Sequence, residues 1–454
     1  MTASSTTPQH RPRGSDPELR RVVTSAAIGQ FVEWYDFVVY AYSAVVISTL
    51  FFPGDDPVAS LLSTFAVYAV GFGMRPIGGV VFGHLGDKLG RRNVLSAVIL
   101  LMGTATLLIG LLPTYAQIGI AAPIILVICR MLQGLSAGGE AMGSNSLVAE
   151  HSDPRKRGLM VGFCYSFANL PAVFAALLVL GITNTVSASA FEAWGWRIPF
   201  LLGGAISFIG LYIRSRVKES PEFEELRSSD TVETAPAISV LRDHTRPLLF
   251  TFVLAALSGL GFYSLTGYFV SYLTESVGLS SNQALISNSI GLLVAFVVMP
   301  LAGGWSDRIG RKQVLVTGAA LTAVVSLPAY LLAGTGTLLP AILGQSLLAF
   351  ALGVFFGPVG IAFLEHFPAR VRFSGSAIGY NAAYIVFGGT APFFCTWLVA
   401  RTDSLLAPAV YTTIVAATVG IIINYLPMAE AEDAEDAEDA GDSARSTDRK
   451  AELA

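Results

Sequence analysis

The 454-residue chain is too apolar and too poor in charge for an ordinary water-soluble protein. Hydrophobic residues make up 53% of it and charged residues only 13%, against roughly 25% charged residues in typical soluble domains. The net charge of -4 argues against nucleic-acid binding. The three cysteines all lie within apolar segments and form neither a disulfide framework nor a zinc-binding pattern. The composition therefore indicates a membrane protein whose fold depends on packing.

Apolar segments long enough to cross a bilayer follow one another along the chain. The first is too long for the apolar region of a secretory signal and is predicted to be a membrane helix. We expect twelve helices, near 22–52, 58–84, 93–112, 119–149, 157–183, 196–215, 248–274, 284–305, 313–333, 338–364, 374–400 and 408–427. The sequence thus predicts an all-α membrane protein.

Basic residues gather in the two tails and in every second connection, with Arg214 counted at the edge of the sixth segment. The opposite connections hold only Arg197 and Arg401, and two further arginines, Arg75 and Arg130, lie inside apolar segments. Because cytoplasmic loops carry the excess of Lys and Arg, both termini are expected in the cytoplasm. The predicted location is the cell (plasma or inner) membrane, crossed many times.

The two halves of the chain are related. Residues 83–95 match 303–315, and residues 150–157 match 365–372 at nearly the same offset. Parallel repeats of six helices imply a pseudo-two-fold axis along the membrane normal, with a site between the halves near the midplane. We predict these regions: a cytoplasmic N-tail 1–21, an N-terminal six-helix bundle 22–215, a cytoplasmic linker 216–247, a C-terminal six-helix bundle 248–427 and an acidic disordered cytoplasmic tail 428–454.

The loop at 83–92, with its echo after the eighth segment, resembles the signature of the major facilitator superfamily. Further motifs resemble the metabolite:H+ symporter family, whose permeases carry proline and betaines, 2-oxoglutarate, citrate or shikimate. These motifs are Glu33-Trp34-Tyr35-Asp36-Phe37, Arg75-Pro76-x-Gly78-Gly79, Arg130-x-x-Gln133-Gly134, Glu219-Ser220-Pro221, Phe367-Pro368-x-Arg370-x-Arg372 and Phe387-Gly388-Gly389-Thr390-Ala391-Pro392. The resemblance implies two pseudo-symmetric six-helix bundles that rock about a central site.

The same resemblance implies a conformational latch, because the loop Asp of the superfamily helps to hold the halves in one conformation. Its candidates are Asp87, Arg91, Arg92, Asp307 and Arg311. The alternative is that this basic loop only anchors the topology.

Buried acidic groups are the candidates for proton coupling. Glu33 and Asp36 share one face near the middle of the first helix. A carboxyl group in a low dielectric is readily protonated, and a nearby guanidinium opposes this. Arg130 is the expected partner, since the element at 130–134 resembles one linked to proton coupling in the superfamily. We therefore predict proton coupling by Glu33, Asp36, Arg130 and Glu140; the alternative is a set of static ion pairs.

Substrate contacts should come from polar and aromatic groups that face the cavity. Arg75 or Arg130 could receive a substrate carboxylate through the planar guanidinium fork. The candidates are Arg75, Tyr40, Gln133, Tyr165, Asn169, Tyr263, Tyr268, Asn288, Tyr380, Asn381 and Tyr384. Each aromatic residue could instead be an interfacial or core residue.

These expectations combine into a proton-coupled symporter that imports a small carboxylate-bearing metabolite, such as an organic acid, proline or betaine, by alternating access. A proton-driven exporter is an alternative, because buried charges do not encode direction; a non-transporting nutrient receptor is another. No nucleophile, phosphate loop or metal-ligand pattern indicates an enzyme, a cofactor or a metal site. The expected partners are the small-molecule substrate, protons and the lipid bilayer, with no nucleic acid, and the chain is expected to function as a monomer.

Overall fold

Helices are the only regular secondary structure in the described part of the chain. The computed structural model describes residues 16–219, 223–224 and 236–425. Residues 1–15 of the predicted N-tail and the whole predicted tail 428–454 lie outside these ranges, so the disorder of that tail stays a prediction. The predicted linker is described in part, and it contains α12 (Pro236–Asp243).

The N-terminal half begins with α1 and ends with α10, and we call it the N-half. Its elements, with short 3₁₀ and π turns marked η, are α1 (Asp16–Tyr42), α2 (Ala44–Phe51), α3 (Pro57–Leu89), α4 (Arg91–Leu111), α5 (Tyr115–Ile118), α6 (Ala121–His151), η1 (Pro154–Lys156), α7 (Arg157–Ser166), η2 (Phe167–Asn169), α8 (Leu170–Thr185), α9 (Ala188–Ala190), η3 (Phe191–Gly195) and α10 (Arg197–Ser215). The first helix starts earlier than the predicted residue 22, and α3 runs beyond the predicted residue 84.

The C-terminal half begins after α12, and we call it the C-half. Its elements are α13 (Thr245–Tyr263), η4 (Ser264–Tyr268), α14 (Phe269–Ser271), η5 (Tyr272–Ser276), α15 (Ser281–Ile309), α16 (Arg311–Ala333), α17 (Leu338–Glu365), α18 (Arg372–Ala383), η6 (Tyr384–Gly389), α19 (Ala391–Thr402) and α20 (Ala407–Tyr425). The predicted helix ends in this half are within a few residues of these bounds.

Eleven helical segments of the described chain are long and apolar enough to cross a membrane, and they correspond to the second to twelfth predicted helices. The first predicted helix, α1 with α2, is not among them. It nevertheless packs inside the N-half against α6, α8 and α10. The described part of the chain is thus an all-α membrane protein with twelve membrane-spanning segments, α1 with α2 counted as the first, in two bundles of six.

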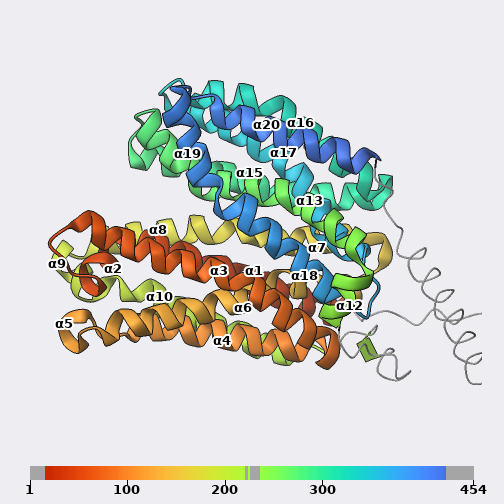
Figure 1. Ribbon diagram of the computed structural model, residues 1–454, viewed down its shortest axis with the longest axis horizontal. Helices are drawn as coiled ribbons and strands as arrows, with labels where there is room; N and C mark the ends of the chain where they lie inside the picture. Colours follow the sequence, from red (N-terminus) through yellow and green to blue (C-terminus); the bar gives the residue numbers. More distant parts are fainter. Residues whose placement is uncertain (1–15, 220–222, 225–235, 426–454) are drawn as a thin grey trace, which may run out of the picture.

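The two halves lie side by side and diverge toward one end (Figure 1). They meet through two pseudo-equivalent helices: α7 of the N-half packs on α15 and α17, and α18 of the C-half packs on α3 and α6. Small residues make this approach possible. A Cβ on Gly162 of α7 would lie 2.9 Å from the carbonyl oxygen of Gly357 on α17.

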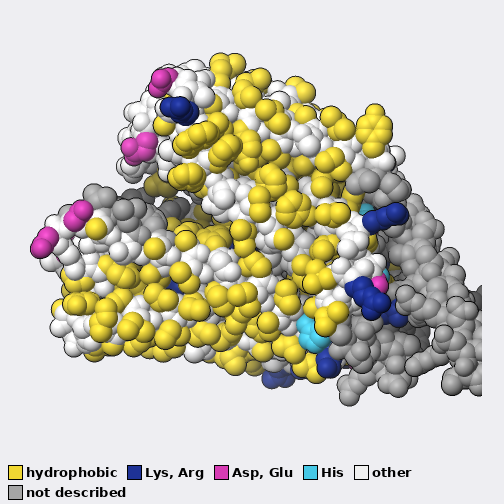
Figure 2. All heavy atoms as spheres, in the orientation of Figure 1, with side chains coloured by type: hydrophobic (Ala, Val, Ile, Leu, Met, Phe, Trp, Pro, Cys, Tyr) yellow, Lys and Arg dark blue, Asp and Glu magenta, His cyan; other side chains and the backbone are white. Residues whose placement is uncertain are grey.

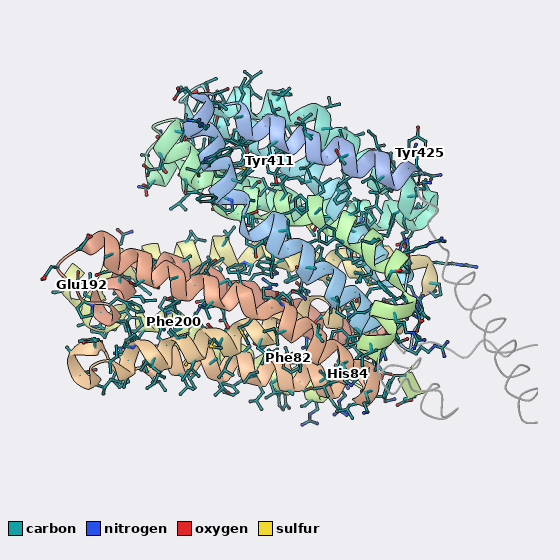
Figure 3. The ribbon with its side chains drawn as sticks, viewed as in Figure 1. Phe82, His84, Glu192, Phe200, Tyr411 and Tyr425 are labelled. Carbon is teal, nitrogen blue, oxygen red and sulfur yellow. The ribbon has the colours of Figure 1, made fainter. Side chains whose placement is uncertain are left out.

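The two ends of the molecule differ in their contacts. We call the end with α12 and the turns at Gly90 and Gly310 the linker end, and the opposite end, with α2, α5 and α9, the far end (Figure 1). Figure 3 marks His84 at the linker end and Glu192 at the far end. The two linker-end turns repeat one conformation, with φ of 100° at Gly90 and 97° at Gly310. Only glycine adopts this region without strain, which explains the glycine in both copies of the loop.

Candidate functional site

Glu33 of α1 and Arg75 of α3 form an ion pair in the middle of the N-half. Their side chains are 0% and 2% exposed. The Arg75 guanidinium also lies over aromatic rings, 4.9 Å from the centroid of Trp34 and 5.3 Å from that of Phe37. Within the described chain, Glu33 Oε2 and two nitrogens of Arg75, Nε and Nη1, have no hydrogen-bond partner. The pair therefore keeps unused hydrogen-bonding capacity on both sides.

The expected pairing of both acids with Arg130 is wrong for Glu33. The Arg130 guanidinium stacks 4.3 Å from the ring centroid of Tyr40, which lies about two helical turns beyond Glu33 toward the far end. Arg75, a predicted substrate contact, takes the place next to Glu33 instead. Sequence spacing gives the height of a side chain along its own helix, but it does not give the rotation of neighbouring helices.

Asp36 is held by neutral donors. Its Oδ2 accepts hydrogen bonds from the hydroxyl of Thr106 on α4 and from Nε2 of Gln133 on α6, the latter at 3.4 Å. Gln133 connects onward, because its Oε1 accepts a 2.8 Å hydrogen bond from Arg130 Nη1. Asp36 and Arg130 are thus linked through one amide. Thr106 was missed by the sequence analysis, since nothing in the sequence of the third helix distinguishes it from other membrane threonines.

Aromatic side chains from both halves meet beside the Glu33–Arg75 pair. The Trp34 ring lies 4.3 Å from Phe262 of α13, centroid to centroid, and 6.0 Å from Tyr263. Tyr263 in turn lies 6.1 Å from Tyr384, whose ring is 4.0 Å from Tyr380. Rings of α1, α13, α18 and η6 therefore form a continuous group across the interface between the halves, and we call it the aromatic group.

Hydroxyl groups join the halves at the same level. Tyr165 of α7 is 2.9 Å from the hydroxyl of Tyr384 and 3.4 Å from that of Ser258 on α13. The Ser258 and Tyr384 hydroxyls are 3.0 Å apart. Tyr165, Tyr263, Tyr380 and Tyr384, four of the predicted substrate contacts, thus lie together between the halves, and their role stays a prediction. Ser258 was not predicted.

Four other predicted substrate contacts lie elsewhere. The Asn169 amide donates to Ser166 O at 3.0 Å, and the Asn288 amide donates to Leu265 O at 2.5 Å. The Asn381 amide donates to Gly138 O at 2.8 Å, so it helps to join α18 to α6. Tyr268 packs on Tyr272 inside the C-half, with 5.9 Å between centroids. The three amide nitrogens are bonded to backbone carbonyls, whereas Asn169 Oδ1, Asn381 Oδ1 and the Tyr268 hydroxyl have no hydrogen-bond partner among the described residues.

Glu140 has a fully bonded partner that the sequence analysis missed. Arg214 of α10 donates two 2.8 Å hydrogen bonds to it, one to each carboxylate oxygen. Arg214 also donates to Ser25 and to Leu95 O, and Ser144 donates to Glu140. Arg214 was counted as a basic residue at the helix edge, but it is completely buried. This closed arrangement favours the alternative of a static ion pair over proton coupling by Glu140.

Replacing Glu140 with Gln is expected to destabilise the protein by about 3–5 kcal/mol, because it leaves the Arg214 guanidinium buried without its counter-charge. Thermal unfolding of the purified protein measures this loss. The double variant Glu140→Leu/Arg214→Met, which removes both charges, should recover most of the stability. Loss of pH-dependent uptake in Glu140→Gln at unchanged thermal stability would instead assign this pair to coupling.

At the linker end, two aspartates make equivalent contacts between the halves. Asp87, near the end of α3, accepts the backbone N–H groups of Phe373 at 3.2 Å and Ser374 at 2.8 Å, at the start of α18. Asp307, near the end of α15, accepts those at the start of α7, from residues 158 and 159, at 2.8 and 2.9 Å. The free N–H groups and the dipole of a helix N-terminus both favour a carboxylate there. Each half therefore caps a helix of the other.

Arginines complete these two contacts. Arg91 lies 3.2 Å from both Asp87 and Glu150 and donates to Ala369 O at 2.5 Å. Arg311 bonds Asp307 at 2.5 Å and Glu365 at 3.3 Å. Arg92 differs from the other predicted latch residues. Its side chain donates to Ser215 O and its backbone N–H donates to Glu219, so these contacts stay beside the N-half.

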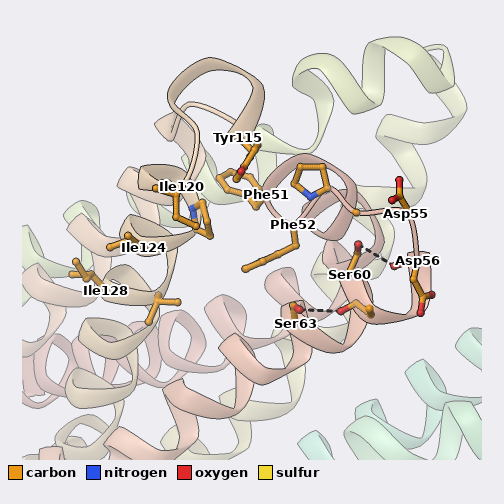
Figure 4. Close-up of a pocket in the computed structure, with 15 residues that line it drawn as sticks. Phe51, Phe52, Asp55, Asp56, Ser60, Ser63, Tyr115, Ile120, Ile124 and Ile128 are labelled. Atoms are coloured by element: carbon orange, nitrogen blue, oxygen red, sulfur yellow. Dashed lines mark hydrogen bonds between the residues drawn. The ribbon is translucent and has the colours of Figure 1, made fainter.

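A separate pocket of about 680 Å³ lies at the far end, between α2, α3, α5 and α6 (Figure 4). Its walls are mainly apolar, with Phe52, Tyr115 and Ile124 among them, and Asp55 and Asp56 stand at its rim. None of the buried charges described above lines it. Among the described residues, no three His, Cys, Asp or Glu side chains come together in a way that could hold a metal ion.

Known proteins resemble this chain over most of its length. The model of the Major Facilitator Superfamily matches residues 26–392. The ectoine/proline transporter ProP of Corynebacterium glutamicum is 35% identical over 424 residues, which cover 90% of this chain and 84% of the relative. The proline/betaine transporter of Escherichia coli K12 is 36% identical over 420 residues, covering 90% and 83%.

The fold is also found among solved structures. That of the proton:xylose symporter XylE bound to 6-bromo-6-deoxy-D-glucose has a TM-score of 0.76 at 18% sequence identity, and the match covers 92% of this chain and 98% of that one. The resemblance inferred from the motifs is confirmed. The chain belongs to the Major Facilitator Superfamily, whose members are transporters and not enzymes.

Proposed function

We propose that this transporter is a proton-coupled symporter that imports a small carboxylate-bearing metabolite, with a zwitterion such as proline or betaine as the favoured substrate. The observation that carries the proposal is the buried Glu33–Arg75 pair beside aromatic rings of both halves. A site that touches both halves can bind solute in either orientation of the two bundles. The relatives named as proline/betaine or ectoine/proline transporters support the same substrate class.

The chemistry of the site suits a molecule with a carboxylate and a cationic nitrogen. Arg75 can bind a substrate carboxylate through its free nitrogens Nε and Nη1. The faces of Trp34, Tyr263 and Tyr384 can bind an ammonium group, quaternary ammonium included. Arg75 now lies over Trp34. A substrate carboxylate that draws the guanidinium away from Trp34 uncovers the face of this ring, and the cationic end of the substrate can then bind there.

Asp36 is the proposed proton site. A direct ion pair with a guanidinium favours the charged carboxylate of Glu33, whereas neutral donors from Thr106 and Gln133 favour the charged form of Asp36 less strongly. Since Asp36 is one turn from Glu33 on the same helix, its proton changes the charge next to the substrate site. Proton and substrate would therefore bind together.

The linker end is proposed to face the cytoplasm. Figure 2 shows most of the visible basic side chains at the linker end and most of the visible acidic ones at the far end, with a hollow between the halves at the far end. The positive-inside rule supports a cytoplasmic location for the linker end. The Asp87 and Asp307 contacts then close the cytoplasmic side while the site faces outward. Release inward requires both contacts to break.

Uptake into proteoliposomes under separate gradients tests the proposal. A proton moving with a zwitterion carries one net charge, which is driven by about 2.3 kcal/mol per 100 mV and by about 1.4 kcal/mol per pH unit. Radiolabelled proline or betaine should therefore accumulate under either gradient alone. Accumulation under the pH gradient only would indicate a monoanion instead. Transport that depends on neither gradient, or substrate efflux driven by inward proton flow, would overturn the symporter assignment.

A further inference from the structure

The hydroxyl of Thr106 stands between two acceptors in the core of the N-half. It is within hydrogen-bond distance of Asp36 Oδ2 and also 2.9 Å from Met102 O, one turn earlier on α4. Gln133 Nε2 donates to the Thr106 oxygen at 2.8 Å. Thr106 is completely buried. Because a hydroxyl has one proton, it can donate to the carboxylate or to the carbonyl, but not to both at once.

We propose that Thr106 is a positioning residue that distinguishes ionised from protonated Asp36 and transmits the difference to Arg130. The inference rests on the proposed proton coupling. With Asp36 ionised, the hydroxyl donates to Oδ2. With Asp36 protonated, the carboxyl group itself donates to the Thr106 oxygen, and the hydroxyl turns to Met102 O, a bond that threonines in helices commonly make. No covalent bond changes apart from the arrival of the proton on Asp36.

Gln133 is the link from this hydroxyl to the charge on α6. Its Nε2 donates to Thr106 while its Oε1 accepts from Arg130 Nη1, each at 2.8 Å. The amide cannot turn without breaking both bonds. Arg130 keeps two further nitrogens, Nε and Nη2, that have no hydrogen-bond partner among the described residues. A change in the Asp36–Thr106 bond therefore reaches a buried guanidinium that is able to take a new acceptor.

The charged and titratable groups around Asp36 come from α1, α3 and α6. From α6 it faces Arg130, and α1 contributes the Tyr35 hydroxyl and Glu33, the latter neutralised by Arg75 of α3. Helix α4 presents the neutral hydroxyl of Thr106 and no charged group that bonds Asp36. Arg214 of α10 is bonded to Glu140. The hydrogen bond from α4 to the ionised Asp36 carboxylate therefore comes from a neutral group, the Thr106 hydroxyl.

The second repeat provides an internal comparison. Ser326 stands as far along α16 as Thr106 stands along α4, counted from the arginine that opens each helix. Among the described residues, its hydroxyl donates to the carbonyl one turn earlier, Thr322 O, at 2.6 Å, and Thr322 in turn donates to Gly318 O at 2.8 Å. Both α4 and α16 thus have, at this position, a hydroxyl within bonding distance of the carbonyl one turn earlier. In α4, the Asp36 carboxylate is a second acceptor for it.

The test compares Thr106→Val, which has nearly the same shape without the hydroxyl, with Thr106→Ser and with Thr322→Val, a control that removes a buried threonine hydroxyl bonded to its own helix on α16. Initial uptake of proline or betaine into proteoliposomes is measured against external pH at fixed internal pH. Removing a donor from an ionised carboxylate should raise the pH of half-maximal uptake in Thr106→Val by about one unit or more. Thr106→Ser and Thr322→Val should keep the wild-type profile.

A second readout follows the carboxyl group directly. In infrared difference spectra, the protonated C=O band that is lost in Asp36→Asn should persist to higher pH in Thr106→Val than in the wild type. An unchanged uptake profile together with an unchanged titration of this band overturns the role of Thr106, even if uptake by the wild type depends on pH. If wild-type uptake does not depend on pH at all, the proposed proton coupling itself fails, and the two failures are distinguishable.

Thr106→Ala replaces the valine variant if the latter is not recovered from the membrane.

Discussion

Replacing Asp36 with Asn is expected to abolish accumulation of solute against its gradient while exchange of internal for external solute continues. Asn matches the shape of a protonated Asp, and its amide N–H can donate to the Thr106 oxygen as the protonated carboxyl group would, so the site should bind solute and rock between its two orientations. It cannot release a proton, and the proton gradient then performs no work on the solute. The Asp36→Asn variant should thus separate binding from coupling.

Two assays on the same proteoliposomes measure this effect: uptake driven by a pH gradient, and counterflow at equal pH. Glu275→Gln, which neutralises an exposed carboxylate near the far end, is the control and should behave as the wild type. Full pH-driven accumulation by Asp36→Asn would remove Asp36 from the coupling role. Loss of counterflow as well would indicate that Asp36 is needed for binding or for rocking.

The second large effect is expected from Asp87→Asn, which should lower uptake at least tenfold while membrane insertion stays normal. The carboxylate accepts two N–H groups of α18 and pairs with Arg91. Hydrogen bonds to a charged group contribute about 1.5–3 kcal/mol each. An amide keeps a single acceptor atom and places its own N–H groups toward the remaining donor. The closed state of the linker end should therefore lose most of this stabilisation.

Hydrogen exchange at the bonded amides reports the result at the site of the change. In Asp87→Asn, the amides of Phe373 and Ser374 should exchange faster, while those of residues 158 and 159 keep their protection. The matched variant Asp307→Asn should give the opposite pattern, because its carboxylate caps α7. Wild-type uptake and unchanged exchange in Asp87→Asn would contradict the latch assignment and favour a role in topology alone.

The motifs predicted the linker-end contacts more successfully than the midplane site. Asp87 and Asp307 belong to one local pattern of glycines and charges in a turn, and such a turn has nearly the same shape wherever it occurs. The midplane charges lack such a pattern. Glu33 was expected to face Arg130, but it pairs with Arg75, and Glu140 pairs with Arg214. These pairings depend on how α1, α3, α6 and α10 are rotated against one another.

The sequence by itself determined that this chain is a membrane protein of twelve spans in two related halves, with buried acids in the first helix, because hydrophobic length, basic loops and repeated turns are local properties. That it is a transporter was implied by the resemblance of its motifs to a known family. Only the tertiary structure decided which charges are paired. It assigned Arg75 to Glu33, enclosed Arg214 with Glu140, and brought Thr106 and Gln133 to Asp36. The physical reason is that a side-chain contact across helices is fixed by rotation and close packing, to within an ångström or so, and no spacing along one helix contains that information.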